Sequence, residues 1–467
     1  MKKIAFFCIP AHGHTNPMLP VASELVKRGN TVRFYSFDAF ESKIRATGAD
    51  FVSCEAFLGE LTEKEEAGLK NVSTTEMTIP DIRITLSMDA FLDEEFKAFQ
   101  PDVVYADSVC FWGKLNAWKH DVPLVVSTST FAFNQMASQY LKHSSKELAD
   151  MIFGLPKISK ELKKLKPYGY KVKNALSLVQ SDNKTDSVVY TSEKFQPYSE
   201  SFSCHYVFVG PSVFSKTEPF KEKERPLVYI SMGTVINDRP DFYAKCMDAL
   251  KDENVDVIIS CGNALDISVL RELPKNTKVY PYVDQLDVLS RADVFITHCG
   301  MNSVSESLYM ATPMILYPQT SEQQAVARRA KEIGAGVMLT NDSVQGIRSA
   351  VLEILNKKSY TAGAEECSED FRSCSGPAGA AAFIETAPHE SEGFDIIEEL
   401  NKTSGKTQIL YWLLAAALIV LFGLLTNWKY IWIIGIAAGV LSTPITKAIQ
   451  NAKYNSLIEK CENKRKK

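Results

Sequence analysis

The sequence predicts an α/β protein in which two parallel sheets, each covered by helices, follow one another along the chain. Three observations support this prediction. Short runs of β-branched and aromatic residues alternate with helical patterns from residue 3 onward, which is typical of βαβ units. A second series of such runs begins after residue 226. The length of 467 residues exceeds what one hydrophobic core usually supports, so more than one domain is expected.

The first series defines a domain over residues 1–210. A helix is expected over 19–27, and two long insertions, 57–79 and 134–180, are expected to be partly helical and to carry variable substrate contacts. The strands of this domain are predicted at 4–9, 31–37, 103–105, 124–127 and 188–190.

The segment 211–226, rich in Ser, Pro, Lys and Glu, is interpreted as a linker between domains. The second domain is placed at 227–400. Its strands are predicted at 227–232, 257–260, 278–280, 294–297 and 314–317.

Composition excludes several classes of protein. The formal net charge of −4 provides no field that would attract nucleic acid, so no nucleic-acid partner is expected. The ten cysteines include no Cys-x-x-Cys pair, which disfavours both a zinc site and a disulfide framework. We therefore expect reduced thiols and no bound metal.

The last part of the chain has a different character. Residues 409–426 and 430–446 contain no charged side chain, and each run approaches the roughly 20 residues that cross a bilayer. Only three residues separate them, and Trp and Tyr lie near their ends. The sequence therefore predicts a pair of transmembrane helices, a hairpin over 408–446, rather than a helical hairpin buried in the core.

The basic tail at 447–467 indicates the side of the membrane on which the protein lies. By the positive-inside tendency, the tail and, with two spans, the N-terminal body both face the cytoplasm. The apolar run 4–9 is short and meets Ala-His-Gly-His instead of a cleavage site, so no signal peptide is predicted. The expected localisation is membrane-associated, with the main body in the cytoplasm.

The segment Thr-His-Cys-Gly-Met-Asn-Ser at 297–303 predicts an anion site. It follows an apolar strand and turns into a helix expected to begin near Asn302. Free backbone N–H groups and the positive end of the helix macrodipole stabilise an anion there, so a phosphate is implied. Small residues at Gly300 and Ser303 permit close approach, and His298 and Asn302 add donors.

Together with its surroundings, this segment resembles family 1 glycosyltransferases, the nucleotide-sugar-dependent enzymes that include plant and bacterial natural-product and macrolide glycosyltransferases. The resemblance covers about residues 1–400. Its motif runs from 282–289 through 298–303 and Glu306 to Pro313, Pro318 and 322–323. It implies a GT-B fold, in which two Rossmann-like domains face each other across a cleft and the C-terminal domain holds the donor.

The resemblance also implies roles for individual residues. Tyr282 takes the place of the aromatic residue that stacks on the nucleobase, which is commonly Trp in plant members, and Ala311 stands where the family usually has Gly. The implied donor-binding residues are Tyr282, Val283, Gln285 and Glu306 for the nucleoside, His298, Gly300, Asn302 and Ser303 for the diphosphate, Ser231, Gly233 and Thr234 for a second phosphate loop, and Glu322 and Gln323 for sugar hydroxyls.

The segment 10–17, Pro-Ala-His-Gly-His-Thr-Asn-Pro, lies between the first strand and the first helix. By the resemblance, His14 is the general base that deprotonates the acceptor, and Asp107 at the end of a later strand is its partner. A neutral imidazole whose other nitrogen donates to a carboxylate has a suitable basicity near neutral pH. Taken alone, His14 could be a loop histidine bonded to backbone and Asp107 a helix N-cap.

These features predict an inverting glycosyltransferase that moves glucose from UDP-glucose, the default donor of the resemblance, to a hydroxyl of a hydrophobic small molecule. No metal or other cofactor is expected. The predicted hairpin favours a membrane lipid or sterol as the alternative acceptor. A non-catalytic membrane protein that binds nucleotide sugars is the alternative of another class.

Overall fold

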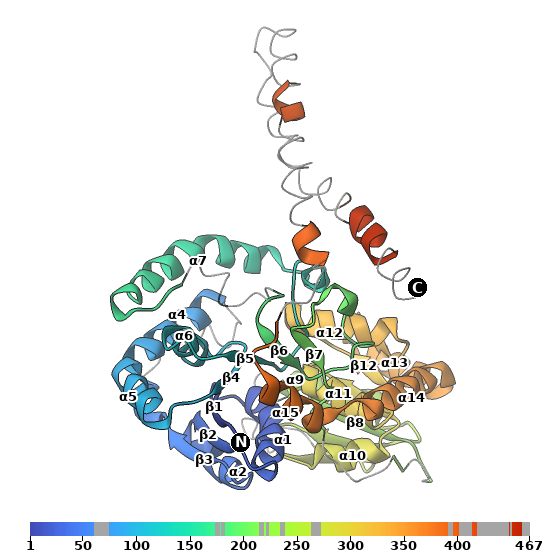
Figure 1. Cartoon of the computed structure of the whole chain (residues 1–467). Coiled ribbons are helices and arrows are strands. Elements are labelled where there is room, and N and C mark those ends of the chain that lie inside the picture. The colour runs from blue at the N-terminus through green and yellow to red at the C-terminus, as the bar shows by residue number, and fades with distance from the viewer. Residues whose placement is uncertain are drawn as a thin grey trace.

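The computed structural model describes residues 1–59, 74–172, 178, 183–213, 219–220, 224–233, 239–262, 272–390, 396–400, 413–417, 448 and 451–459. These residues form two wholly parallel sheets, one in each half of the chain (Figure 1). The predicted tandem α/β architecture is confirmed.

The first sheet has the strand order β3-β2-β1-β4-β5-β6-β7. Its inner strands are apolar on both faces, as expected where helices cover both sides of a parallel sheet. Two short strands, β3 and β7, were not predicted from the sequence. The strands are β1 (Lys3–Phe7), β2 (Thr31–Ser36), β3 (Asp50–Ser53), β4 (Val103–Asp107), β5 (Leu124–Thr128), β6 (Asp186–Val189) and β7 (Tyr206–Phe208).

Helices connect these strands; α7 lies within the predicted insertion 134–180, whereas α4 begins near the end of the insertion 57–79 and extends beyond it. The helices are α1 (His12–Lys27), α2 (Glu41–Arg45), α4 (Thr74–Ser87), α5 (Asp89–Phe99), α6 (Phe111–Lys119) and α7 (Ser145–Lys163). Short 3₁₀ turns are η1 (Asp38–Phe40), η2 (Glu55–Phe57), η3 (Ala137–Tyr140), η4 (Lys166–Tyr168) and η5 (Ser199–Ser201).

Helix α1 begins earlier than predicted, at His12 instead of residue 19, so the prediction that residues 10–17 form a loop is wrong from residue 12 on. The carbonyl of Ala11 accepts from the N–H of Thr15 at 2.9 Å, which closes the first turn. Pro17 and Pro20 follow within the helix, where each removes one backbone donor.

The second sheet has the order β10-β9-β8-β11-β12-β13 and includes one strand, β13, that the sequence did not predict. Its strands are β8 (Leu227–Ser231), β9 (Asp256–Ser260), β10 (Thr277–Tyr280), β11 (Val294–Thr297), β12 (Met314–Leu316) and β13 (Gly336–Met338). The accompanying helices are α9 (Pro240–Leu250), α10 (Gln285–Arg291), α11 (Met301–Tyr309), α12 (Ser321–Glu332), α13 (Val344–Asn356), α14 (Lys358–Ser373) and α15 (Gly376–Thr386).

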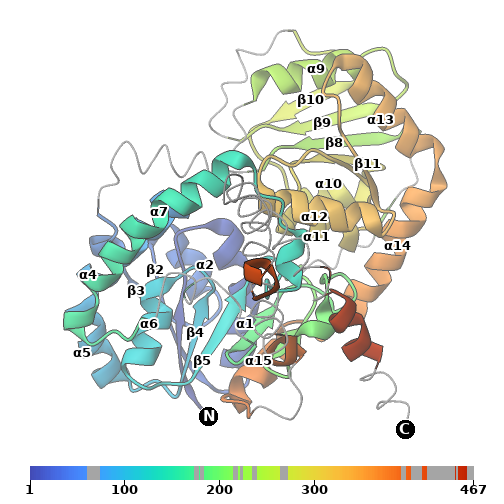
Figure 2. The ribbon, with the colours of Figure 1, turned by 90° about the horizontal axis from the view of Figure 1, so that it is seen from above.

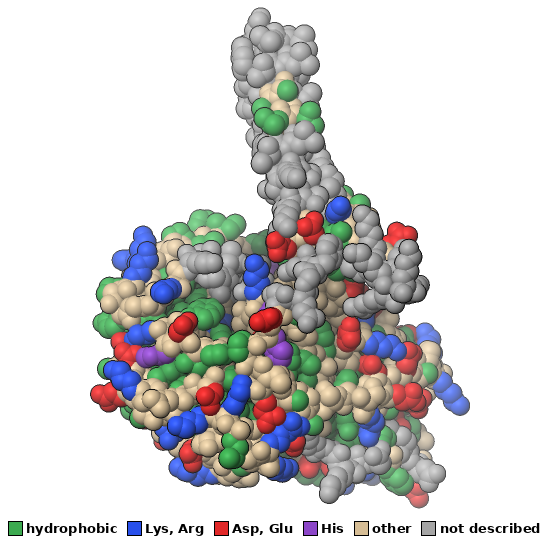
Figure 3. Space-filling model, in the orientation of Figure 1, with side chains coloured by type: hydrophobic (Ala, Val, Ile, Leu, Met, Phe, Trp, Pro, Cys, Tyr) green, Lys and Arg blue, Asp and Glu red, His purple; other side chains and the backbone are tan. Residues whose placement is uncertain are grey.

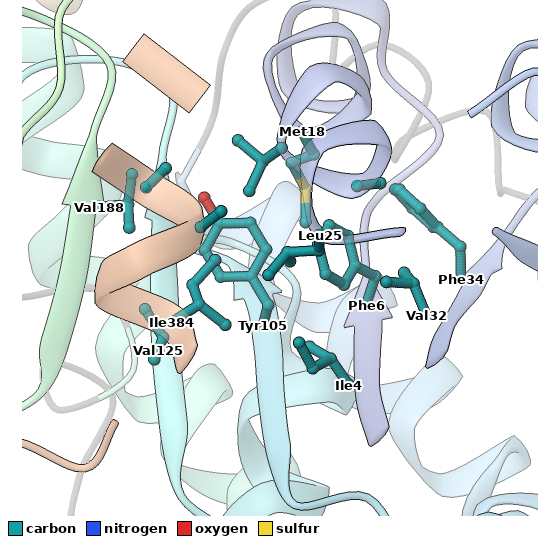
Figure 4. Packing of buried hydrophobic residues seen from close by; sticks show 14 of the residues in the cluster. Ile4, Phe6, Met18, Leu25, Val32, Phe34, Tyr105, Val125, Val188 and Ile384 are labelled. Carbon is teal, nitrogen blue, oxygen red and sulfur yellow. The ribbon is translucent and has the colours of Figure 1, made fainter. Parts of the chain in front are cut away.

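Helix α15 returns from the second domain and packs on the first. Its Ile384 joins the buried cluster that contains Met18 and Leu25 of α1 and Tyr105 of β4 (Figure 4). Arg28 of the first domain pairs with Glu385 at 3.1 Å. Helix α15 therefore completes the core of the first domain.

A buried carboxylate holds the chain just beyond α15. Asp186, at the start of β6, accepts from the backbone N–H of His389 at 2.9 Å and contacts the Nδ1 atoms of His389 and His205 at 3.0 and 2.6 Å. Because both Asp186 and His205 are buried, the bond between them is shielded from solvent. They fasten the returning segment to the first sheet.

The membrane hairpin predicted over 408–446 lies outside the described residues except for a helical turn at 413–417. Within the described part of the chain, no helix combines the length and apolar character needed to cross a bilayer. Part of the predicted basic tail, 451–459, is helical and packs on the body, with Tyr454 and Leu457 buried beside Leu400. The described part of the tail is therefore docked on the protein.

Candidate active site

His14 lies in the first turn of α1, beside the carboxyl end of β4. Its Nδ1 is 2.8 Å from Oδ2 of Asp107, the last residue of β4. β1 and β4 are parallel neighbours, so α1, which follows β1, and the end of β4 meet at the same edge of the sheet. The structure therefore brings together the two residues that the resemblance paired.

Asp107 is fully buried and holds the imidazole in one orientation. Its other oxygen, Oδ1, accepts from the backbone N–H of Val109 at 3.1 Å, which fixes the carboxylate. Ser129, just beyond β5, places its Oγ 3.1 Å from Nδ1 of His14. Because Nδ1 faces Asp107 and Ser129, the hydrogen of the neutral ring is assigned to Nδ1. The lone pair of Nε2 can then accept a proton.

The electrostatic surroundings of His14 favour its protonated form. Burial lowers the pKa of the imidazole, but the carboxylate of Asp107 and its hydrogen bond, with Glu322 and Asp81 contributing, raise the pKa above its ordinary value overall. Glu322 belongs to the second domain, so its influence on His14 is exerted across the domain boundary.

Asp81 on α4 is a third acidic residue at this site, which the sequence analysis missed. Burial, followed by the charge of Asp107, raises the pKa of Asp81 to about 8, against the opposing charges of Lys114 and His14. These surroundings favour the protonated form of Asp81. The sequence contains no motif around Asp81 or Ser129. Both residues come close to His14 only through the way α4 and β5 pack in the folded chain.

In the second domain, the turn between β11 and α11 has the geometry that the sequence predicted. Cys299 adopts a left-handed φ of 67°, and Gly300 is the N-cap of α11, which begins at Met301, one residue before the predicted start. No side chain caps this helix end. Its first N–H groups are therefore available to an anion.

The imidazole of His298 is held between two glycines. A Cβ on Gly233 would lie 2.5 Å from its Nε2, and a Cβ on Gly300 would lie 2.6 Å from the same atom. Burial lowers the pKa of His298 to about 4, so the ring is neutral. Its Nδ1 is buried and lacks a hydrogen-bond partner among the described residues. A neutral polar group next to a helix end is suited to a phosphate oxygen.

Two of the residues assigned to the nucleoside, Gln285 and Glu306, are hydrogen-bonded to each other. Nε2 of Gln285 donates to Oε2 of Glu306 at 2.6 Å and to Oγ of Ser303 at 3.4 Å. Burial raises the pKa of Glu306 to about 7, although the bond from Gln285 opposes the increase. Tyr282 leaves 80% of its surface exposed, whereas Val283 packs on the core of the second domain.

The remaining predicted donor residues lie at strand and helix ends. Ser231 ends β8, and its Oγ accepts from the N–H of Gly233 at 3.4 Å. Glu322 is exposed in the first turn of α12, and Oε1 of Gln323 accepts from the N–H of Gln319 at 2.8 Å. Thr234 lies outside the described residues.

One hydrogen bond joins the two halves of the site. Nδ2 of Asn302, in the first turn of α11, donates to the backbone carbonyl of Gly13 at 3.2 Å. In a regular helix this carbonyl would accept from residue 17, but Pro17 has no N–H to donate. The missing helical bond is thus replaced by a bond from the other domain, next to His14.

Comparisons with known proteins identify the family. The profile described as "UDP-glucoronosyl and UDP-glucosyl transferase" matches residues 214–369. Two Bacillus subtilis (strain 168) proteins, the uncharacterized UDP-glucosyltransferases YojK and YdhE, are 30% and 32% identical to the chain. The alignments cover 82% and 80% of this chain and 97% and 95% of those proteins. The chain belongs to this family of glycosyltransferases.

A solved relative confirms the fold of the glycosyltransferase. The crystal structure of CalG4, the calicheamicin glycosyltransferase, superposes with a TM-score of 0.68 at 25% identity. The match covers 83% of this chain and 100% of that one. The two-domain GT-B architecture implied by the resemblance is therefore correct.

Among the described residues, no group of three or more His, Cys, Asp or Glu side chains is placed to hold a metal ion. Transfer without a metal stays a prediction. The groups predicted to face the diphosphate are neutral donors and a helix end, which suit an anion without requiring a cation.

Proposed function

We propose that this glycosyltransferase transfers glucose from UDP-glucose, with inversion, to a hydroxyl group of a hydrophobic acceptor. The observation that carries the proposal is the junction between the domains. His14 is oriented by Asp107, and the end of α11 is bonded to the turn that carries His14 through Asn302 and Gly13. A proton acceptor and an anion-binding helix end thus lie side by side.

In the proposed reaction, Nε2 of His14 takes the proton of the acceptor hydroxyl. The acceptor oxygen forms a bond to the anomeric carbon while the bond from that carbon to the diphosphate oxygen breaks. The nucleoside diphosphate leaves from the opposite face, so an α-linked donor gives a β-glycoside. Negative charge grows on the leaving group, and the end of α11 with His298 stabilises it more in the transition state than in the ground state.

The remaining residues are assigned to donor recognition. The exposed ring of Tyr282 offers a stacking surface for the base, and Gln285 with Glu306 offers hydrogen bonds to the ribose. Glu322 and Gln323 are assigned to the sugar hydroxyls. The preference for uracil over thymine and for glucose over other sugars is the part of this proposal taken from the family alone.

The second candidate acceptor is a membrane lipid or sterol. The uncharged sequences at 409–426 and 430–446 favour it, because a predicted bilayer hairpin would keep the enzyme at the surface where such acceptors are found. Sugar recovered in a membrane-lipid extract, and not on added soluble aglycones, would select this candidate.

The decisive experiment is a mass-spectrometric assay of donor hydrolysis and transfer with several nucleotide sugars, in which His14→Ala is compared with wild type. We expect transfer to fall by about 10²–10⁴-fold while binding of the donor is retained. His12→Ala is the matched control, because this neighbour packs on Phe40 with 4.9 Å between ring centroids and is expected to leave the rate unchanged.

Two outcomes would contradict the proposal. Unchanged transfer by His14→Ala would exclude this residue as the base. Donor binding by the wild type without transfer to any acceptor pool, and without hydrolysis, would favour the non-catalytic nucleotide-sugar-binding protein.

A further inference from the structure

Helix α7 presents large apolar side chains to solvent on the face that points away from the protein. Gly154, Ile158 and Leu162 recur every four residues and form its buried face. Ile152 and Phe153 lie on the other side of the helix and are 64% and 74% exposed. Such side chains are ordinary when they occur singly, but adjacent ones on one helix indicate a contact surface.

The apolar patch of α7 is larger than these two side chains. Leu148 and Leu155 are also exposed, by 46% and 45%. Figure 3 shows hydrophobic side chains gathered over the part of the surface that α7 forms. A capping box, in which Ser144 and Glu147 bond reciprocally, fixes the start of the helix, so the patch lies on an ordered element.

The stretch of chain that contains this patch carries a net positive charge. The stretch 142–166 contains seven lysines and only three acidic residues. Lys157, Lys160 and Lys163 are exposed on the later turns of the same helix. Apolar side chains in one part of a surface helix and lysines in another are typical of helices that lie in the interface of an anionic bilayer.

The position of α7 agrees with this chemistry. It lies over α4 and α6 on the side of the body toward which the turn at 413–417 projects (Figures 1 and 2). Met136, next to η3, belongs to the same buried cluster as Leu400 and Tyr454. The described residues that precede and follow the uncharged segments thus pack together with Met136. This residue lies nine positions before Ser145, the start of α7.

We propose that the outward face of α7 docks on an anionic lipid bilayer, with Ile152 and Phe153 inserted among the headgroups and the lysines paired with lipid phosphates. This inference rests on the proposed attachment through 408–446. Together, the hairpin and α7 would fix the orientation of the body on the membrane.

Docking through α7 would also set the surroundings of the acceptor. Helix α4, which carries Asp81, packs directly beneath α7. Asp81 interacts electrostatically with His14, so α4 connects the docked helix to the proposed base. This geometry deepens the proposed function by favouring an acceptor hydroxyl presented at the membrane surface.

The test uses the full chain in vesicles of phosphatidylcholine, with or without phosphatidylglycerol, that contain a trace of phospholipid bearing a photoactivatable headgroup. Trypsin releases residues 147–157, which hold the whole apolar patch, and residues 407–429 and 430–447, which hold the uncharged segments. We expect lipid adducts on 147–157 in anionic vesicles. The double variant Ile152→Ser, Phe153→Ser should reduce them by about tenfold or more.

Phe220→Ser is the matched control, because this residue is exposed by 58% outside α7 and should leave the adducts unchanged. Adducts on 407–447 without adducts on 147–157 would overturn docking while retaining membrane attachment. Adducts on none of these peptides would overturn the attachment itself. Loss of self-association in the double variant, without lipid adducts on 147–157, would assign the patch to a second copy instead.

Discussion

The two halves of the candidate active site satisfy their polar groups in opposite ways. In the first domain, both oxygens of Asp107 are bonded, one to His14 and the other to the backbone of Val109. In the second domain, the end of α11 has no side-chain cap, and Nδ1 of His298 lacks a partner among the described residues. The first half holds one reactive group in place, and the second leaves donors available to a ligand.

This difference teaches where each half should be sensitive to substitution. A group held by a complete set of bonds is perturbed by removing one bonding partner. A set of open donors is perturbed by filling the space in front of it. The predictions that follow test this division.

The largest effect is expected from Asp107→Asn. The amide cannot stabilise the protonated imidazole, so kcat should fall by about 10²–10⁴-fold. Because Asp107 is the main cause that raises the pKa of His14, the acidic limb of the pH–rate profile should move to lower pH in the variant. The profile of kcat against pH measures both effects.

Asp102→Asn is the matched control for this prediction. Asp102 immediately precedes β4 at the other edge of the sheet, where it accepts from the N–H of Lys3 at 2.7 Å. Asp102→Asn should leave the acidic limb of the pH–rate profile at its wild-type position. A fall in kcat by Asp107→Asn without movement of the limb would mean that Asp107 acts only by holding the fold.

The next effect concerns Asp81 and stability. Its pKa is about 8 in the folded chain and near 3.8 when unfolded, so the folded state holds an extra proton between these values. The free energy of unfolding should therefore fall as pH rises from about 4 to about 8. Asp81→Asn should remove this slope. At pH 8 its free energy of unfolding should exceed that of wild type by about 2–4 kcal/mol.

Urea denaturation at pH 5 and pH 8 measures this difference. Asp50→Asn, at an exposed position of β3, should retain the slope of the wild type. Equal slopes in wild type and Asp81→Asn would show that Asp81 is solvated and does not sense His14.

A smaller effect is expected in the open half from Gly233→Ala. Gly233 has a φ of +81°, and a Cβ there would collide with His298. We expect binding of UDP, measured by calorimetry, to weaken by about tenfold or more as the ring shifts. Gly334→Ala is the control, since φ is +76° but nothing lies within 4 Å of its Cβ. If both variants bind UDP equally well, the position of His298 does not matter for the phosphate.

The smallest effect is expected at Ala311, where the family usually has Gly. Its φ of 52° is left-handed, a conformation that costs an alanine more than a glycine. Ala311→Gly should raise the free energy of unfolding by about 0.5–1 kcal/mol. Ala335 is buried and does not have a positive φ, so Ala335→Gly should lower the free energy of unfolding. Thermal unfolding of both variants distinguishes the two signs.

The sequence predicted more of the second domain's site than of the first's. The phosphate turn at 297–303 is local, so strand, glycine and helix start are all legible within a few residues. Asp81 and Ser129 reach His14 from α4 and β5, and nothing near them in the chain signals this. The strands β3, β7 and β13 were missed because each combines three or four residues with an edge position and partly exposed side chains, which leaves little apolar pattern.

The sequence by itself determined the two parallel sheets and the turn at 297–303, because burial on both faces of a sheet and the conformation of a turn are set by neighbouring residues, whereas the pairing of His14 with Asp107 was implied by the family resemblance. Only the tertiary structure decided that Asn302 replaces the helical bond missing at Pro17, that α15 completes the opposite core, and that the apolar patch of α7 lies outward. These features depend on which surfaces meet, and contacts between residues hundreds of positions apart leave no periodic trace along the chain.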